Sequence, residues 1–302
     1  MAHERRPRVD VVTIVDHPVL DAFRHGAEDA LKASGYEPGV KIDWTFQSAQ
    51  GNNATAAQIA RKFVGEQPDV ILAISTPAAQ AVVAATRNIP VVYGAVTDPV
   101  AAQLVKSMQT SGSNVTGVSD RLVPEKQADL IKRLLPSVKK VGMIYNPAEA
   151  NSVVTVREMK AALSKIGVVL IEAAAPRSVD VGQAARRLVG KVDVIYTGTD
   201  NNVVSAYEAV AKVGNDAKIP LVAADTGSIK RGAVAALSVN YRDLGSQAGR
   251  QIVRILKGEH PANISSETSD KLLLILNMEA ARKQGVEISG QLQSEASEIF
   301  GR

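Results

Sequence analysis

The 302-residue sequence predicts an α/β protein with two similar lobes, each a parallel sheet flanked by helices. The first observation is a buried strand pattern, because residues 69–74 form a short apolar run without polar alternation, as in a sheet covered on both faces. The second is that polar residues and then a segment of helical periodicity follow this run. The third is that this order of strand, polar tip and helix occurs again later in the chain.

The segment PDVILAISTPAAQAVVAAT, residues 68–86, shows this order in full. Its strand ends at Ser75 and Thr76, and Pro77 stands where the first turn of a helix tolerates proline. Either hydroxyl is a candidate N-cap. At such a tip, free backbone N–H groups and the positive end of the helix dipole also face the crevice where open parallel sheets bind ligands. Capping and ligand binding both remain open for the two hydroxyls.

The order of elements repeats in two pairs of segments. Residues 140–170 repeat the pattern of 8–36, and residues 192–225 repeat that of 68–99. Repetition at this separation indicates two α/β lobes rather than a solenoid. We expect three crossings between lobes, with the candidate passages near 119, at 233–245 and at 271–285. The predicted lobes are 8–118 with 242–272 and 119–241 with 273–302, with a ligand cleft between them, and three crossings form a hinge on which rigid lobes close.

Composition excludes several classes of protein. Lys and Arg are interleaved with Asp and Glu despite a net charge of +4, and aromatic residues make up 4% of the chain, so nucleic acid is not an expected partner. The chain has no cysteine, which excludes disulfides and thiolate metal sites. No apolar stretch reaches membrane-spanning length. The start MAHERRPR lacks the apolar core of a secretory signal, as the mature form of an exported protein also would.

Polar residues follow the expected carboxyl ends of six strands. If the lobes face each other, these tips converge on one cleft, which is the preferred place for a small ligand. For a single tip helix capping is the commoner role, and it is the agreement of six that favours a ligand site. Tyr145, Tyr196 and Tyr241 adjoin the tips and either present ring faces or pack in the core. The candidate ligand-binding residues are His17, Pro18, Ser75, Thr76, Thr97, Asp98, Asn146, Glu149, Asn151, Ser152, Thr199, Asp200, Asn201, Asp225 and Tyr241.

The sequence offers little support for catalysis. It contains no Walker loop, no G-x-G-x-x-G, no G-x-S-x-G and no H-E-x-x-H. Of the four histidines, His3 lies in the N-terminal tail and His260 in an expected loop, which leaves His17 and His25 and no basis for a metal triad or a Ser-His-Asp arrangement. Binding without chemistry is therefore the favoured class, with no cofactor and no metal.

These residues resemble the bacterial ABC-transporter substrate-binding proteins of the type that includes tryptophan- and phenylalanine-binding members. The likeness runs from about Arg8 to Gly285. It is carried most specifically by IYNPAEANS and TDNNVVSA, and also by VDHPVLDAFRHG, PDVILAISTPAAQA, TDP at 97–99 and LNMEAARKQGVEI. The resemblance implies a periplasmic-binding-protein fold of the first type, with Rossmann-like lobes and three hinge strands. It also implies a monomer outside the cytoplasm, periplasmic or extracytoplasmic, that delivers a solute to a membrane permease, although this chain lacks a lipobox cysteine.

For an α-amino acid ligand, the same residues divide into two sets. The carboxylate suits Ser75 and Thr76 with the helix N-terminus behind them. The ammonium needs a carboxylate, for which Asp200 is the first choice, followed by Asp225 and Glu149. Neutral hydrogen bonds are expected from Asn151, Ser152 and Asn201. The family favours an aromatic amino acid, while a branched aliphatic one or another carboxylate satisfies the same polar groups.

Two other classes of function use this fold. An α/β enzyme acting on a small sugar, nucleotide or carboxylate in the same cleft is the main alternative, supported by the Asp tips and His17. The effector-binding half of a transcription regulator is less favoured, because too few residues precede the first strand for a helix-turn-helix.

Overall fold

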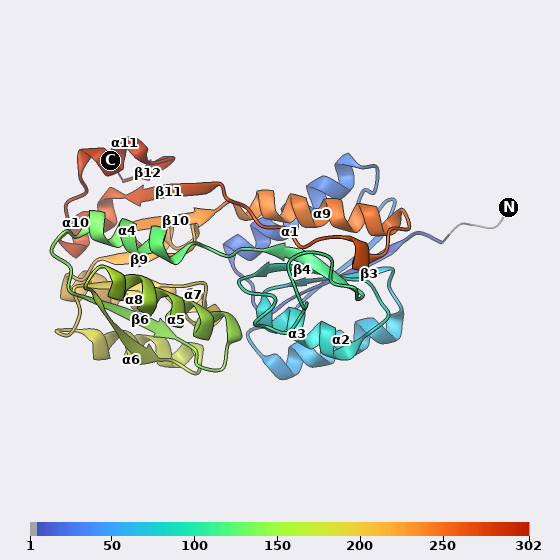
Figure 1. The fold of residues 1–302 in the computed structure, drawn as a ribbon, viewed down its shortest axis with the longest axis horizontal. Helices are drawn as coiled ribbons and strands as arrows, with labels where there is room; N and C mark the ends of the chain where they lie inside the picture. The colour runs from blue at the N-terminus through green and yellow to red at the C-terminus, as the bar shows by residue number, and fades with distance from the viewer. Residues whose placement is uncertain (1–4, 302) are drawn as a thin grey trace. The chain divides into compact units, whose positions relative to one another are not determined.

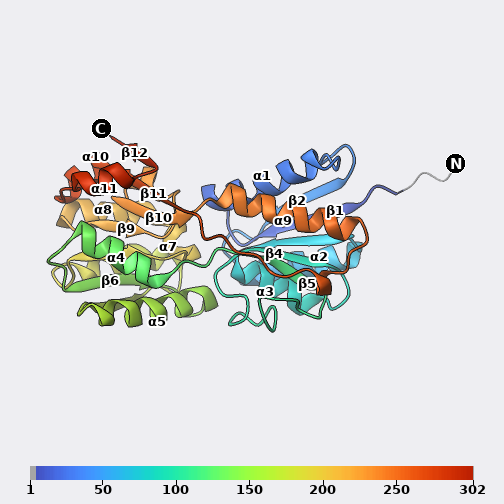
Figure 2. The same cartoon turned by 45° about the horizontal axis from the view of Figure 1, so that its top comes forward.

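The computed structural model describes residues 5–301, which form two compact units. Unit 1 comprises the described chain up to Arg121 together with Asn240–Asp270, and unit 2 comprises Leu122–Val239 together with the described chain from Lys271. The chain passes from one unit to the other three times, after Arg121, Val239 and Asp270, whereas the sequence placed these passages two or three residues away. Figures 1 and 2 show both units, coloured along the chain.

Unit 1 contains a five-stranded sheet in the order β2-β1-β3-β4-β5, in which every pair is parallel. Each residue of β3 and β5 is buried, as predicted from their unbroken apolar character. The strands are β1 (Arg8–Thr13), β2 (Asp43–Ser48), β3 (Val70–Ile74), β4 (Val91–Val96) and β5 (Val115–Ser119).

Four long helices cover this sheet. Helices α1 (Pro18–Ala33) and α9 (Tyr241–Leu256) lie side by side on one face, and α2 (Asn53–Glu66) and α3 (Thr76–Ala85) lie on the other (Figures 1 and 2). Helix α9 is distant from α1 in sequence, and glycine allows the two backbones to touch. A Cβ atom at Gly245 would lie only 1.8 Å from the carbonyl oxygen of Phe23.

Unit 2 contains a seven-stranded sheet in the order β12-β11-β10-β9-β8-β6-β7. The prediction of a parallel sheet is correct for the five strands β6 to β10. It is wrong for β11, which runs antiparallel to β10, and for β12, which pairs parallel with β11 and so shares its direction. Because β10 leads the chain out of unit 2 and β11 leads it back, the two neighbours run in opposite directions. The strands are β6 (Lys140–Tyr145), β7 (Val169–Ala174), β8 (Val194–Thr197), β9 (Leu221–Ala223), β10 (Ala235–Val239), β11 (Leu272–Asn277) and β12 (Glu298–Phe300).

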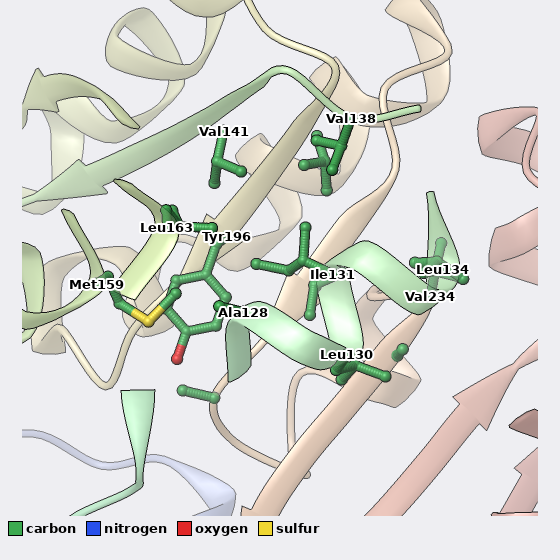
Figure 3. Packing of buried hydrophobic residues seen from close by; sticks show 14 of the residues in the cluster. Ala128, Leu130, Ile131, Leu134, Val138, Val141, Met159, Leu163, Tyr196 and Val234 are labelled. Carbon is green, nitrogen blue, oxygen red and sulfur yellow. The ribbon is translucent and has the colours of Figure 1, made fainter. Parts of the chain in front are cut away.

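Helices cover both faces of this sheet as well. The core of one face lies between the sheet and helices α4 and α5, and Figure 3 shows Tyr196 of β8 in it, beside Met159. Tyr207 and Val210 lie in the core of the other face. The helices of unit 2 are α4 (Pro124–Leu134), α5 (Ala150–Lys165), α6 (Val181–Leu188), α7 (Asn201–Ser205), α8 (Tyr207–Ala217), α10 (Met278–Gln284) and α11 (Gly290–Glu295).

The strand orders confirm the repeat predicted from the sequence. The order β7-β6-β8-β9-β10 in unit 2 has the same connectivity as β2-β1-β3-β4-β5 in unit 1. In such a sheet the strand order reverses between the first and third strands, and ligands bind outside the carboxyl ends at this switch point. The switch points lie at β1 and β3 in unit 1 and at β6 and β8 in unit 2. Within residues 5–301 no helix has both the length and the apolar character needed to cross a membrane.

Candidate functional site: the strand tips of the two units

In unit 2, the predicted tips of β6 and β8 meet through the carboxylate of Asp200. Its Oδ2 accepts hydrogen bonds from the backbone N–H of Asn146 and the hydroxyl of Ser152, both at 2.6 Å. Its Oδ1 accepts one from the N–H of Val203 at 3.0 Å and so caps α7. Donors from the protein therefore engage both oxygens of Asp200, and its carboxylate fixes the β6 tip to the β8 tip.

Glu149 is a second buried carboxylate at this switch point. It occupies the N-cap position of α5, but its side chain makes no capping hydrogen bond. Its Oε2 instead accepts from the backbone N–H and the amide of Asn201, at 3.3 and 3.0 Å, and from the amide of Asn151 at 3.2 Å. Within residues 5–301 no hydrogen bond reaches its Oε1. Glu149 therefore retains a free acceptor oxygen at the site.

Asn151 supplies a further acceptor. Its amide nitrogen donates to Glu149 and to the carbonyl oxygen of Thr199 at 3.2 Å, and because both partners are acceptors, the orientation of the amide is fixed. Its Oδ1 is buried without a hydrogen-bond partner. A buried polar atom without a partner costs about 1–3 kcal/mol, and a ligand that donates a hydrogen bond would remove this cost.

Burial dominates the electrostatics of the two carboxylates. Glu149 and Asp200 are 6% and 1% exposed, and no ion pair involving either is found in residues 5–301. Burial, together with the charge of Asp200, raises the pKa of Glu149 to about 7. Burial also raises the pKa of Asp200, against the opposing effect of the hydrogen bonds from Ser152 and Asn146. This edge of unit 2 therefore stabilises positive charge from a proton or from a ligand.

In unit 1, the tip of β3 has a different character. Ser75 occupies the N-cap position of α3, but its hydroxyl does not cap the helix, and Oγ is buried without a hydrogen-bond partner. Its backbone has φ 85° and ψ 156°, a conformation populated almost entirely by glycine. The capping alternative is therefore wrong for the Ser75 side chain. Thr76 follows as the first residue of α3, also buried, and Pro77 occupies the predicted place in the first turn.

The other first-lobe candidates are engaged in local structure. Nδ1 of His17 accepts from the N–H of Val19 at 3.2 Å and caps α1, of which Pro18 is the first residue. Asp98 accepts from the N–H groups of Val100 and Ala101 and pairs with Arg121 at 2.8 Å. These contacts give the imidazole of His17 and the carboxylate of Asp98 structural roles. A ligand role for either residue stays a prediction.

The structure also identifies a residue that sequence analysis missed, Asp120. It follows β5 and is 4% exposed, and its carboxylate accepts from Thr97 Oγ1 at 3.2 Å and from the hydroxyl of Tyr241 at 2.8 Å. Burial raises its pKa. The carboxylate of Asp120 thus brings together two predicted site residues, Thr97 and Tyr241. The only sequence signal for Asp120 is its position directly after a buried strand.

The last candidates lie in unit 2. Asp225, 1% exposed, accepts from the N–H and hydroxyl of Ser228 at 2.9 and 2.6 Å and closes the turn after β9. Tyr196 belongs to the core, and Tyr145 donates its hydroxyl to Glu172 at 2.9 Å. Of the two alternatives for Tyr196, core packing is the correct one. In residues 5–301 no group of three or more His, Asp or Glu side chains is arranged to hold a metal ion.

Two doubly wound α/β units, connected three times and carrying polar groups at their switch points, form a fold of the first periplasmic-binding-protein type. The sequence profile of the ABC transporter substrate binding proteins matches residues 8–300, and the chain belongs to this family. It is the substrate-binding component of an ABC transporter, as the resemblance implied.

Three similar proteins illustrate the family. A tyrosine-binding protein from Clostridioides difficile is 41% identical over 274 residues, which cover 91% of this chain and 79% of that protein. The crystal structure of a conserved domain protein from Vibrio cholerae has 43% identity and a TM-score of 0.96, with 98% and 100% of the two chains covered. An ABC domain from Streptococcus pneumoniae, in complex with L-Trp, has 31% identity and a TM-score of 0.95, with the same coverage.

Proposed function

We propose that this protein binds a small α-amino acid, with an aromatic side chain favoured, and delivers it unchanged to a membrane permease. The observation that carries the proposal is the pair of buried carboxylates in unit 2, Glu149 and Asp200, for which residues 5–301 provide no cationic partner. Buried charges in proteins are normally paired, and an α-ammonium group is a cation of suitable size. A neutral sugar would leave this negative charge without compensation.

Glu149 is the better candidate for direct contact with the ammonium, although the sequence favoured Asp200. Three donors of the protein already occupy the oxygens of Asp200, whereas Oε1 of Glu149 has no hydrogen bond from the described chain. The partnerless Oδ1 of Asn151 adds a second acceptor for an ammonium N–H. In this proposal Asp200 fixes the tips and adds negative charge at short range, and Asn146, Ser152 and Asn201 hold the two carboxylates in place.

The carboxylate of the ligand is assigned to the start of α3. Ser75 has a buried hydroxyl without a partner at a helix N-terminus, and α3 has no acidic residue in its first turn. Free N–H groups and the helix dipole favour an anion at such a position. A strained serine with a partnerless hydroxyl lowers the stability of the unliganded protein. A hydrogen bond from this hydroxyl to a ligand carboxylate would offset that loss.

The preference for an aromatic side chain comes from the relatives. The Clostridioides protein is named for tyrosine binding, and the Streptococcus domain was crystallised with L-Trp. Membership of the family supports four further parts of the proposal: binding without chemical change, an extracytoplasmic location, a monomeric state and a permease partner.

A ligand screen tests the proposal. Thermal unfolding of the purified protein is measured with each of the twenty amino acids and with a panel of sugars, and binders are then titrated calorimetrically. Because a ligand that binds only the folded state stabilises by RT ln(1 + [L]/Kd), a hundredfold excess over Kd should add about 2.7 kcal/mol. Mass spectrometry of the ligand recovered after incubation should show it unaltered. Stabilisation by sugars alone, or an altered ligand, would contradict the proposal.

A further inference from the structure

The two carboxylates of unit 2 are held close together by the first residue of α7. Asn201 directly follows Asp200 and donates both its backbone N–H and its side-chain amide to Glu149. All the hydrogen-bond donors that reach either carboxylate in residues 5–301 are neutral groups: backbone N–H groups, amides and one hydroxyl. The pair is therefore polarised by dipoles but not neutralised by a cation.

The charged groups on the surrounding elements have other partners. Lys160 of α5 pairs with Glu172 of β7 at 3.3 Å, and Arg177 pairs with Asp180 in the turn before α6 at 2.8 Å. Arg231, which donates to the carbonyl oxygen of Val204 in α7, pairs with Glu208 of α8. The remaining charges of α5 lie on its later turns, where Arg157 is exposed to solvent. None of these ion pairs includes Glu149 or Asp200.

Two carboxyl groups at short range in a buried site cannot both ionise at low cost, because their negative charges repel. One of them takes up a proton until another cation is available. Glu149 is the better site for that proton, because Oε1 is free to carry it, whereas the oxygens of Asp200 each accept hydrogen bonds from donors that a proton would oppose.

We propose that in the unliganded protein the Glu149–Asp200 pair holds one proton, on Glu149, and that the ammonium group of the ligand displaces this proton into solvent. The inference rests on the proposed function, since it requires a ligand with an ammonium group. Charge balances in the exchange: one cation enters, one proton leaves, and no covalent bond other than the O–H bond of Glu149 is broken. Amino acid binding is thereby coupled to pH.

The consequence is an affinity that rises with pH. Below the pKa of Glu149, which burial raises to about 7, the ligand must compete with the proton. A single displaced proton weakens the apparent affinity by roughly tenfold between pH 8 and pH 6. The ligand ammonium and carboxylate do not change their charge in this range, so the dependence reports on the protein.

Calorimetry on the wild-type protein measures this exchange directly. L-Tyrosine and L-tryptophan are titrated at pH 6 in buffers of different ionisation enthalpy, and the slope of the observed enthalpy against buffer ionisation enthalpy gives the number of protons released. We expect a release approaching one proton per ligand at pH 6 that falls toward zero at pH 8. The matched probe is the deaminated analogue 3-(4-hydroxyphenyl)propionate, which lacks the ammonium and should release no proton.

Two variants complete the test. Glu149→Gln should lose both the proton release and the pH dependence of affinity, with its fold checked by circular dichroism, while Glu125→Gln, a surface variant in α4, should retain both. Amino acid binding without proton release at pH 6 would overturn this inference and leave the proposed function standing. Failure of every amino acid to bind would overturn the proposed function, and the inference with it. Because the wild-type titration decides the question alone, a misfolded Glu149→Gln variant would not obscure the result.

Discussion

The starts of helices α3 and α5 are built from the same local pattern of strand, polar tip and helix, but their chemistry is opposite. At α3 the N-cap residue is Ser75, in a glycine-like backbone conformation, with a buried hydroxyl that has no partner. At α5 the N-cap residue is Glu149, a carboxylate buried beside Asp200. Neither side chain caps its helix. A residue at a cap position that leaves the cap unused is free for a ligand, and here one residue suits an anion and the other a cation.

Most other predicted tips differ from these two because their side chains are used locally. His17, Asp98, Asp200 and Asp225 all accept backbone N–H groups close by in the chain. The comparison indicates that a polar residue at a strand end becomes a strong ligand candidate when the structure leaves one of its polar atoms without a hydrogen bond.

Removing the negative charge of Glu149 should have the largest effect on binding. The change Glu149→Gln keeps the shape and leaves the ligand ammonium poorly compensated, and loss of one partner of a buried charge pair costs on the order of 2 to 5 kcal/mol. This corresponds to a loss of affinity of roughly thirtyfold to several thousandfold. Calorimetric titration beside wild type and Glu125→Gln measures it. An affinity within about threefold of wild type would exclude Glu149 from the ligand site.

The stability of the unliganded protein should fall as pH rises through the pKa of Glu149. The pKa of this group is raised from 4.5 to about 7 on folding, so the folded state binds more protons than the unfolded state between these values. Its contribution is fully present below pH 4.5 and is lost as pH rises through about 7, a change of roughly 3 kcal/mol. Urea unfolding at pH 5 and pH 8 measures the difference, and Glu149→Gln should reduce it by the contribution of this one group. Equal pH dependence in the variant would refute this assignment.

Substitution of Ser75 should separate strain from binding. Ser75→Gly removes the hydroxyl and relieves the backbone, so the unliganded protein should become more stable by about 1 kcal/mol. Loss of a hydrogen bond to a charged group should weaken ligand binding by about 1.5–3 kcal/mol. The matched variant Ser75→Ala removes the hydroxyl and keeps the strain, and should weaken binding without the gain in stability. If Ser75→Gly destabilised the protein, the strain argument would be wrong.

Asp200→Asn should affect stability more than binding. Asparagine caps a helix about as well as aspartate, but its amide must face one of the donors now bound by the carboxylate, either Val203 N–H or the pair from Asn146 and Ser152. One unsatisfied buried donor costs about 1–3 kcal/mol of unfolding free energy. The exposed Asp129→Asn serves as control. A larger loss of affinity than in Glu149→Gln would return Asp200 to first place as the ammonium partner.

The architecture was largely predictable because the pattern of strand, polar tip and helix is repeated in the two halves of the chain. The apolar run at 69–74, the Pro77 helix start and the matching segments at 192–225 together predicted two α/β lobes with three crossings. Strand direction at β11 was not predictable, because an apolar run looks the same in a parallel and an antiparallel pair. It depends on where the chain re-enters unit 2.

The sequence showed the residue types of the site, but it did not show which partners each side chain has. Asp200 and Asn146 are 54 positions apart, and Asp120 and Tyr241 are 121 positions apart, so the pairings arise only in the folded chain. The unused hydroxyl of Ser75 also requires the backbone geometry, since a serine before a helix normally predicts a cap.

The most direct test of the account is a cycle that combines ligand analogues with the two variants. Calorimetric titration compares L-tyrosine, tyramine without the carboxylate and 3-(4-hydroxyphenyl)propionate without the ammonium, against wild type, Ser75→Gly and Glu149→Gln. We expect wild type to discriminate strongly against both analogues, Ser75→Gly to discriminate less against tyramine, and Glu149→Gln to discriminate less against the deaminated acid. Equal discrimination by all three proteins, or the opposite pairing of variant and analogue, would contradict the assignment of the two helix starts.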